Sequence, residues 1–413
     1  MKKFFTILGP GLLYAGAAIG VSHLVQSTKA GALFNYDLII VLILANILKY
    51  PFFEFGTRYA NATGNNLVDG YAKVGKWAVI VFAILTFGSM FIITAAVSVV
   101  SVALIAYVFE ISINISVLSV IILLVSGLVL IVGKYSLLDK FIKFIIVLLS
   151  VSTIVAVFAA LGVDKVVKPE SFVNFEWTNS AHILFLISFV GWMPAPIDIS
   201  VFSSLWTNAK TKSLGYTPAL KDVLLEFRIG YISTTILAIC FLVLGGLVMW
   251  GTGESFSDKG TVFAGQLINM YTISIGDWAY WVISIAAITT MFSTTLTVLD
   301  AYPRVLSAIQ ENLIGKKQKP IKHLSVYWLL LLIAGTSVII MFLAKSMAFM
   351  VNFATTLSFI VAPILAWLNY KVVTDSHMPD SHKPDKFLRI LSWIGIAFFV
   401  VFTLIYFYWV IFQ

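Results

Sequence analysis

The stretch Gly191-Trp192-Met193-Pro194-Ala195-Pro196 interrupts an otherwise apolar segment, residues 181–206. Pro194 and Pro196 lack a backbone N–H, and each ring clashes with the preceding helical turn, so a continuous helix is not expected here. Inside a membrane, backbone that leaves its helix is tolerated only where it faces protein or a water-filled cavity. The stretch therefore predicts a broken membrane helix whose break faces the interior of a helical bundle. An ordinary proline kink at a helix contact is the alternative.

The composition of the whole chain is that of a membrane protein. Of its 413 residues, 60% are hydrophobic and 11% are charged, against roughly 25% charged in a soluble domain. The apolar runs are continuous and reach the length of about 20 residues that a spanning helix needs, unlike the alternating segments of about ten residues in a membrane β-barrel. We therefore predict an all-α integral membrane protein, a single domain over 1–413, with 11 spanning helices at 9–30, 36–59, 77–109, 114–133, 139–162, 181–206, 229–250, 272–302, 325–344, 347–370 and 388–411.

The distribution of basic residues predicts the orientation of the chain. With these spans, all but five of the 27 Lys and Arg residues, Lys49 included, fall on the side of the N-terminus. Cytoplasmic loops carry such an excess of Lys and Arg, so we expect a cytoplasmic N-terminus and an extracytoplasmic C-terminus. The net charge of +8 then requires no nucleic-acid partner. The abundance of Lys over Arg, and of Ile and Phe, indicates a bacterial source and hence an inner membrane.

The first predicted span carries a second candidate break. Gly9-Pro10-Gly11 opens it, and Gly16, Gly20 and Ser22-His23 lie near mid-membrane. Spans one and six take equivalent positions if the chain comprises two five-helix repeats, about 9–162 and about 181–370, followed by an extra helix at about 388–411. Because each repeat has five spans, an odd number, the second repeat crosses the membrane in the opposite orientation to the first. Interrupted helices at matching positions of two inverted halves point to the central site of a transporter.

Ionisable residues next to both candidate breaks indicate a binding site, because such residues are costly inside a membrane and mark functional positions. His23 follows the first break and Asp198 follows the second. With the thioether of Met193 and the hydroxyl of Ser22, they suit a transition metal, whereas Mg²⁺ prefers oxygen ligands and water. The structural alternatives are a hydrogen bond from His23 to a neighbouring helix, packing for Met193, and helix capping by Asp198.

Two further pairs of charged residues lie within predicted spans at helical spacing. Glu54 and Arg58 are four residues apart, as are Asp300 and Arg304, so each pair can form an ion pair along one helix face. We expect either structural pairs or gating pairs near the cytoplasmic ends of their helices. In contrast, span three carries no acidic or basic residue between Trp77 and Val108, so a proton relay through it has no group to use.

No motif for catalysis accompanies these features. The sequence has no phosphate-binding loop, no nucleophile motif and only one cysteine, Cys240. We therefore predict that the protein is not an enzyme, uses no cofactor and is not driven by ATP.

Several short motifs resemble those of the Nramp family of divalent-metal transporters. They are Leu8-Gly9-Pro10-Gly11-Leu12-Leu13 in span one, Met193-Pro194 in span six and Ser293-Thr294-Thr295-Leu296-Thr297 in span eight. The likeness extends over about residues 5–410. It implies a LeuT-like fold of five plus five inverted helices and the transport of a divalent metal, which many members couple to protons.

The resemblance also shows departures at the expected metal site. The Asp-Pro-Gly-Asn motif of the family falls on Gly20-Val21-Ser22-His23, so Gly20 replaces the binding aspartate and His23 the asparagine. The Met-Pro-His motif falls on Met193-Pro194-Ala195, which keeps the methionine and loses the histidine. Backbone carbonyl ligands would come from about Ala17 and Val190. Because a desolvated divalent ion without a carboxylate faces a penalty of several kcal/mol or more, we expect Asp198 to supply the charge.

These observations predict a secondary transporter that works by alternating access around the two breaks. Its expected partners are a small inorganic cation, foremost a divalent metal, and the lipid bilayer, while proton coupling is expected to be weak or absent and the oligomeric state stays open. The alternatives are a small organic or zwitterionic solute as cargo, or a membrane sensor that binds without transport. The predicted metal ligands are His23, Met193 and Asp198, within a substrate-binding set of Ala17, Gly20, Ser22, His23, Val190, Met193, Ala195 and Asp198.

Overall fold

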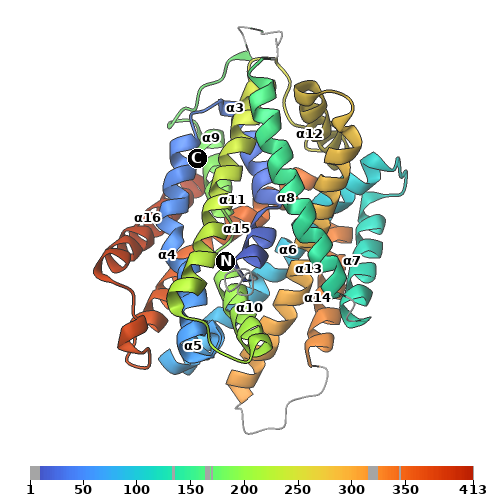
Figure 1. The fold of residues 1–413 in the computed structure, drawn as a ribbon. Coiled ribbons are helices and arrows are strands. Elements are labelled where there is room, and N and C mark those ends of the chain that lie inside the picture. The colour runs from blue at the N-terminus through green and yellow to red at the C-terminus, as the bar shows by residue number, and fades with distance from the viewer. Residues whose placement is uncertain are drawn as a thin grey trace.

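The computed structural model describes residues 10–132, 135–162, 168, 171–314, 324–343 and 346–412. Within these residues the chain is helical nearly throughout and contains no strand, and the helices form one elongated bundle (Figure 1). Leu8 and Gly9 of the first motif lie outside the described residues.

The helices fall into two broken segments and a series of long single helices. The broken segments are α2 (Pro10–Ala18), the π-helix η1 (Ser22–Ser27) and α3 (Thr28–Phe34), and further along α9 (Ser180–Gly191) and α10 (Ile199–Leu214). The single helices are α4 (Ile39–Thr63), α5 (Leu67–Val74), α6 (Lys76–Val108), α7 (Ile115–Val132), α8 (Tyr135–Ala160), α11 (Leu220–Val248), α12 (Gly260–Ile275), α13 (Ala279–Ile314), α14 (Leu324–Leu343), α15 (Met347–Thr374) and α16 (Lys386–Phe412), with a 3₁₀ turn, η3 (Asp380–His382).

The helices agree with a multi-pass membrane protein. Eight of them, α4, α6, α7, α11, α13, α14, α15 and α16, are long and apolar enough to cross a bilayer by length and composition. The broken segments and α8 lie where the remaining spans are predicted, although the count of 11 stays a prediction. Two short helices, α5 and α12, lie where no span is predicted.

Both predicted breaks are present. In the first segment α2 ends at Ala18, and the chain resumes as a π-helix from Ser22. In the second, α9 ends at Gly191 and α10 begins at Ile199. The prediction of two interrupted helices from proline and glycine content is therefore confirmed.

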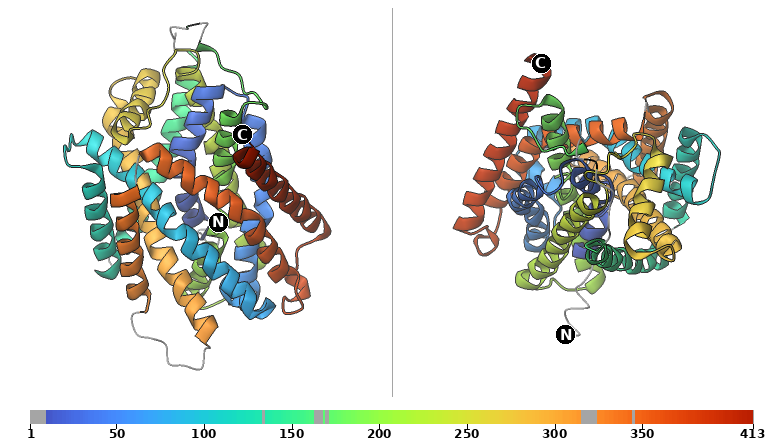
Figure 2. Two further views of the ribbon diagram at one scale, coloured as in Figure 1. Left: turned by 180° about the vertical axis from the view of Figure 1, so that it is seen from behind. Right: turned by 90° about the horizontal axis from the view of Figure 1, so that it is seen from above.

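The bundle has a buried centre and an exposed rim. The most apolar window of α6 is 83% buried, whereas that of α16 is 22% buried and that of α7 is 28% buried. Accordingly α6 and α15 cross the body of the molecule, and α7 and α16 lie at its edges (Figure 2). The exposed faces of the outer helices carry many large apolar side chains. Such faces are suited to contact with lipid rather than water.

The first segment is packed closely against α11 through glycine. A Cβ atom added at Gly31 would lie 1.8 Å from the carbonyl oxygen of Leu242, and one added at Gly245 would lie 2.2 Å from that of Thr28. Both distances are shorter than any real contact, so only glycine allows the backbones of α3 and α11 to approach this closely.

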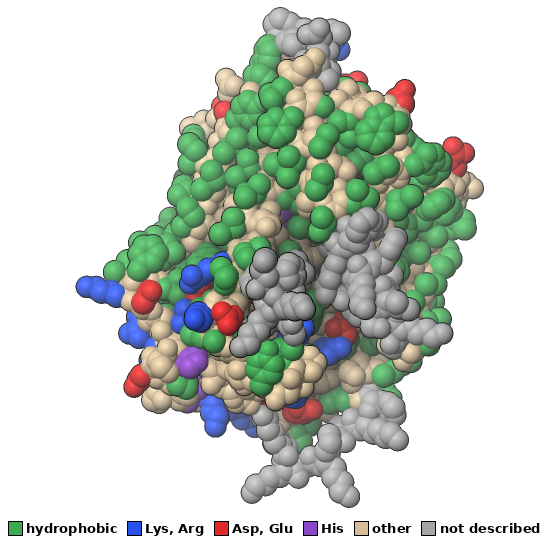
Figure 3. Space-filling model, in the orientation of Figure 1, with side chains coloured by type: hydrophobic (Ala, Val, Ile, Leu, Met, Phe, Trp, Pro, Cys, Tyr) green, Lys and Arg blue, Asp and Glu red, His purple; other side chains and the backbone are tan. Residues whose placement is uncertain are grey.

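The surface divides by chemistry along the length of the bundle. On the face shown in Figure 3, hydrophobic side chains cover most of the body, and most of the visible Lys and Arg side chains gather towards the end that carries α5. An apolar body with charges towards its ends is the surface expected of a protein embedded in a bilayer.

Candidate functional site

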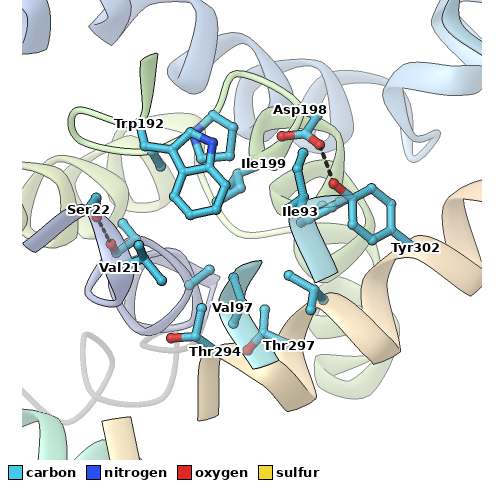
Figure 4. Close-up of a pocket in the computed structure, with 16 residues that line it drawn as sticks. Val21, Ser22, Ile93, Val97, Trp192, Asp198, Ile199, Thr294, Thr297 and Tyr302 are labelled. Atoms are coloured by element: carbon cyan, nitrogen blue, oxygen red, sulfur yellow. Dashed lines mark hydrogen bonds between the residues drawn. The ribbon is translucent and has the colours of Figure 1, made fainter. Parts of the chain in front are cut away.

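A small buried cavity lies between the two breaks (Figure 4). Its volume is about 30 Å³, room for one or two water molecules, so the helices are closed around it. It is lined by residues of α2, η1, α6, α10, α13 and the linker between α9 and α10: Ala17, Ala18, Val21, Ser22, Ile93, Val97, Trp192, Ala195, Pro196, Asp198, Ile199, Phe202, Thr294, Thr297, Val298 and Tyr302.

Asp198 is the one acidic or basic residue in this lining. It directly precedes α10, yet its side chain makes no capping hydrogen bond. Instead its Oδ2 accepts a hydrogen bond of 2.8 Å from the hydroxyl of Tyr302 on α13 (Figure 4). Its Oδ1 is buried and has no hydrogen-bond partner among the described residues. Asp198 therefore occupies the N-cap position of α10 without a capping hydrogen bond, and one carboxylate oxygen is available to a ligand.

The other polar side-chain groups of the lining are hydroxyls and the indole N–H of Trp192, which donates to Ser358 at 2.7 Å and has no lone pair for a cation. Ser22 donates to the carbonyl oxygen of Ala18 at 2.6 Å, and Thr297 donates to that of Ser293 at 2.9 Å. Each of these hydroxyls keeps lone pairs for a ligand. The side-chain donors to a ligand in this cavity are therefore oxygen atoms, the set that hard divalent cations prefer.

His23 is fully buried but is not part of the cavity lining. Its Nδ1 lies 2.7 Å from the hydroxyl oxygen of Ser22, and its Nε2 lies 2.9 Å from the carbonyl oxygen of Thr234 on α11. A carbonyl can only accept, so Nε2 carries the proton and donates. This geometry matches the structural alternative for His23, a hydrogen bond to a neighbouring helix.

Met193 is also buried outside the lining. It follows α9 and precedes a cis peptide bond to Pro194. The structure therefore does not bring the three predicted metal ligands together around the cavity: Asp198 lines it, and His23 and Met193 do not. Among the described residues no cluster of three or more His, Cys, Asp and Glu side chains is placed to hold a metal ion.

Ala17 lies near the end of α2, and Gly20 lies within the first break. Ala17 lines the cavity. At Gly20, an added Cβ would lie 2.8 Å from the Oγ1 of Thr294, so the side chain of Thr294 occupies the space that an aspartate at position 20 would need.

The carbonyl of Val190, a metal ligand by resemblance, has a different partner here. Lys49, near the middle of α4, directs its Nζ at the carbonyl oxygens of Val190 at 2.6 Å, Gly191 at 2.8 Å and Ala195 at 3.3 Å. Its side chain is fully buried. Lys49, counted from the sequence among the basic residues on the side of the N-terminus, is therefore a buried residue of α4 at the second break and not part of a basic surface. A lysine in the middle of a predicted span was a signal for this role, because charges inside spans mark functional positions.

Glu54 and Arg58 form the predicted ion pair, which is part of a larger network. The Oε1 of Glu54 accepts from Nε and Nη2 of Arg58 at 3.0 and 2.5 Å, and its other oxygen accepts from Tyr50. Arg228 of α11 lies 3.4 Å from the same carboxylate. Arg58 also donates to the carbonyl oxygen of His382 at 3.0 Å. The buried Glu54 therefore joins α4, α11 and the turn η3.

Asp300 and Arg304 also pair, with Nη2 and Oδ1 2.7 Å apart, but half of the Arg304 side chain is exposed. This pair lies on α13, outside the cavity lining. An exposed pair of this kind contributes about 0.3–0.5 kcal/mol to helix stability.

Solved structures with the same fold are transporters. One is a manganese transporter of Eremococcus coleocola in complex with an aromatic bis-isothiourea compound, with a TM-score of 0.68 and 14% identity over 98% of this chain and 86% of that one. Another is a nucleobase-cation-symport-1 family transporter in a closed conformation with bromovinylhydantoin bound, with a TM-score of 0.61 and 13% identity over 97% and 89% of the two chains. The all-α bundle with two broken helices around the cavity therefore has the LeuT-like fold that these structures share.

The sequence comparisons give the family. The model of the Nramp family, described as natural resistance-associated macrophage protein-like, matches residues 11–409. An uncharacterized protein of Pasteurella multocida (strain Pm70) is 37% identical over 406 residues, which cover 97% of this chain and 92% of that protein. The chain belongs to the Nramp family, and it is a multi-pass membrane transporter, not an enzyme.

Proposed function

We propose that this protein moves a divalent metal cation across a membrane by alternating access, through the cavity between its two broken helices. Family membership over residues 11–409 and the fold that it shares with a manganese transporter support a metal as cargo. The observation that carries the proposal within this chain is Asp198, whose Oδ1 is buried without a partner beside the cavity. It supplies the negative charge that Gly20 cannot.

The donor set narrows the kind of cation. Next to the Asp198 carboxylate, the lining offers the hydroxyls of Ser22, Thr294 and Thr297 but neither a thioether nor an imidazole, and the hydroxyl of Tyr302 is held by Asp198. Carboxylate, hydroxyl and water oxygens suit Mg²⁺, Ca²⁺ and Mn²⁺. We therefore favour a cation that keeps part of its water shell, over the thioether-ligated transition metal that Met193 suggests from the sequence.

The proposal includes an orientation of the chain in the membrane and a gate on its cytoplasmic side. The N-terminus lies in the cytoplasm of a bacterial cell and the C-terminus outside the inner membrane, with residues about 9–162 and about 181–370 as inverted repeats. Glu54 holds α4, α11 and η3 together, so this network keeps the cytoplasmic side closed until the ion pairs separate. Proton passage through α6 is not part of the cycle, since α6 has no acidic or basic residue between Trp77 and Val108.

The test is uptake of Mn²⁺ into proteoliposomes, read with a trapped dye that the metal quenches. We expect Asp198→Asn to reduce the initial rate by about tenfold or more, the range found for lost metal-site interactions, and excess Mg²⁺ or Ca²⁺ to compete. The matched control is Asp258→Asn, because Asp258 is 71% exposed and pairs only loosely with Lys29. It should retain the wild-type rate.

An organic solute is the second candidate cargo. The cavity lining is mostly apolar, and Lys49 already takes the carbonyl of Val190. If the folded wild-type protein shows no flux of any divalent ion, and small zwitterions raise its melting temperature, the metal proposal is wrong and the organic cargo takes its place.

A further inference from the structure

Lys49 is a buried cation held by backbone oxygens. Its Nζ lies between 2.6 and 3.3 Å from three carbonyl oxygens, those of Val190, Gly191 and Ala195. None of the ion pairs found among the described residues includes Lys49. Three acceptors around one nitrogen call for three N–H donors, a number that only the protonated amine provides. The geometry is therefore that of an ammonium ion with carbonyl ligands.

The sequence of the break explains why these carbonyls need such a partner. In an α-helix the carbonyl of residue 190 would accept from the N–H of residue 194, but residue 194 is proline and has no N–H. The N–H of Met193 donates to this carbonyl at 3.2 Å instead, and the second lone pair of the oxygen faces Lys49. Gly191 is the last residue of α9, and Ala195 lies in the linker between two prolines. The carbonyl end of a helix also carries a partial negative charge. A positive group at this point both satisfies the oxygens and faces the favourable end of the α9 dipole.

The carbonyl set adjoins the cavity through one of its three residues. Ala195 belongs to the cavity lining, whereas Lys49 does not. Gly191 is held tightly from the far side, because an added Cβ would lie 2.1 Å from the carbonyl oxygen of Thr355 on α15. The oxygens are thus fixed by packing, and their arrangement does not depend on the cargo.

We propose that the end of α9 is a carbonyl-lined site for a monovalent cation, and that the ammonium of Lys49 fills it permanently. The chain supplies from its own side chain a cation that would otherwise come from solution. Shortening this side chain empties the site, which then takes a small monovalent cation such as ammonium, methylammonium, K⁺ or Na⁺. Choline is too large to enter.

The experiment compares purified wild-type protein with Lys49→Ala in buffers of equal ionic strength that contain choline chloride, NaCl, KCl or methylammonium chloride. Melting temperatures are measured by intrinsic fluorescence in detergent. We expect the wild-type value to be the same in all four salts. For Lys49→Ala we expect a lower value in choline that rises by about 3 °C or more, with saturation, in methylammonium, since a ligand that binds only the folded state stabilises it.

A matched control separates this site from general salt effects. Lys73 is exposed on α5, so Lys73→Ala should melt at the same temperature in every salt. Folding of Lys49→Ala is followed in parallel by gel filtration after extraction in choline or methylammonium. Monodisperse protein in methylammonium and aggregate in choline supports the proposal.

Two outcomes overturn it. The first is a Lys49→Ala variant whose melting temperature is equal in all four salts. The second is a variant that aggregates equally in choline and methylammonium, because the proposal requires a free ammonium ion to restore what the tethered one supplies. None of these measurements involves divalent metal flux, so the result can contradict this proposal without contradicting the transport proposal, and the reverse.

Discussion

The two helix breaks of this protein are stabilised in different ways. At the first break, the exposed carbonyls are satisfied by nearby hydroxyls: Ser22 donates to Ala18 at 2.6 Å, and Ser27 and Thr28 donate to Ser22 and His23 at 3.2 Å each. At the second break, one lysine from α4 serves three carbonyls of a segment more than 140 residues away. The donors at the first break are neutral and mostly close in sequence, with Thr294 of α13 at 3.5 Å from the carbonyl of Ile19 as a distant one. The second break depends on a charge from another helix.

This difference shows two ways to satisfy the backbone carbonyls that a break in a membrane helix leaves without their helical donors. A hydroxyl four or five residues C-terminal to a carbonyl can donate a hydrogen bond to it. The desolvation cost is small because no charge is buried. An ammonium ion satisfies more oxygens at once, but it must be buried, and its loss removes a donor from three carbonyls, of which that of Val190 alone keeps the N–H of Met193. The second break should therefore be the more sensitive to substitution.

The strongest test of this comparison is Lys49→Met, which keeps the length of the side chain and removes its donors. Three buried carbonyls lose a donor at once, although that of Val190 keeps the N–H of Met193 at 3.2 Å. Each unsatisfied buried group costs about 1–3 kcal/mol, and this loss is partly offset because a charge is no longer buried. We expect the free energy of unfolding in mixed micelles to fall by about 3 kcal/mol. A variant as stable as the wild type would show that water or backbone can satisfy the second break.

The matching change at the first break is His23→Phe, which keeps a ring and removes the hydrogen bond to the carbonyl of Thr234. We expect a smaller loss of about 1–2 kcal/mol, because Ser22 still donates to Ala18. The same unfolding measurement checks it. A loss as large as that of Lys49→Met would mean that the first break also rests on a single residue.

The smallest effect on stability is expected for Tyr302→Phe. The hydroxyl of Tyr302 holds one oxygen of Asp198, and its removal should cost about 1 kcal/mol of stability. It also leaves the carboxylate free for a cation, so under the proposed function the half-saturating Mn²⁺ concentration should fall several-fold. An unchanged or higher concentration would argue that Tyr302 itself contributes to the metal site.

Much of the fold can be predicted from the sequence, because its signals are local. Pro194 removes the very N–H that the carbonyl of Val190 would accept from, so the second break follows from the residue type alone. Long apolar runs predicted the membrane helices for the same reason. The two short helices α5 and α12 were not predicted, since neither is long enough for a spanning helix.

The candidate site was predicted less completely, because its partners are distant in sequence. His23 lies in a π-helix. Its i→i+5 hydrogen bonds make a wider turn than an α-helix and so change the directions of its side chains. The α-helical spacing of the sequence therefore does not predict that His23 faces Thr234. The carbonyls of the second break found their donor on α4, and only the packing of α4 against α9 and α10 determines which side chain reaches them. Asp198 was found because a carboxylate next to a break is unusual in any context.

The contact between α3 and α11 has a practical consequence for studies of motion. Gly31 and Gly245 allow the two backbones to lie in direct contact, and we expect α3 and α11 to move together as one unit. Spin labels on the outer faces of α3 and α11 would thus keep one separation through the whole cycle. That pair offers an internal ruler against which displacements of α9 or α10 can be calibrated.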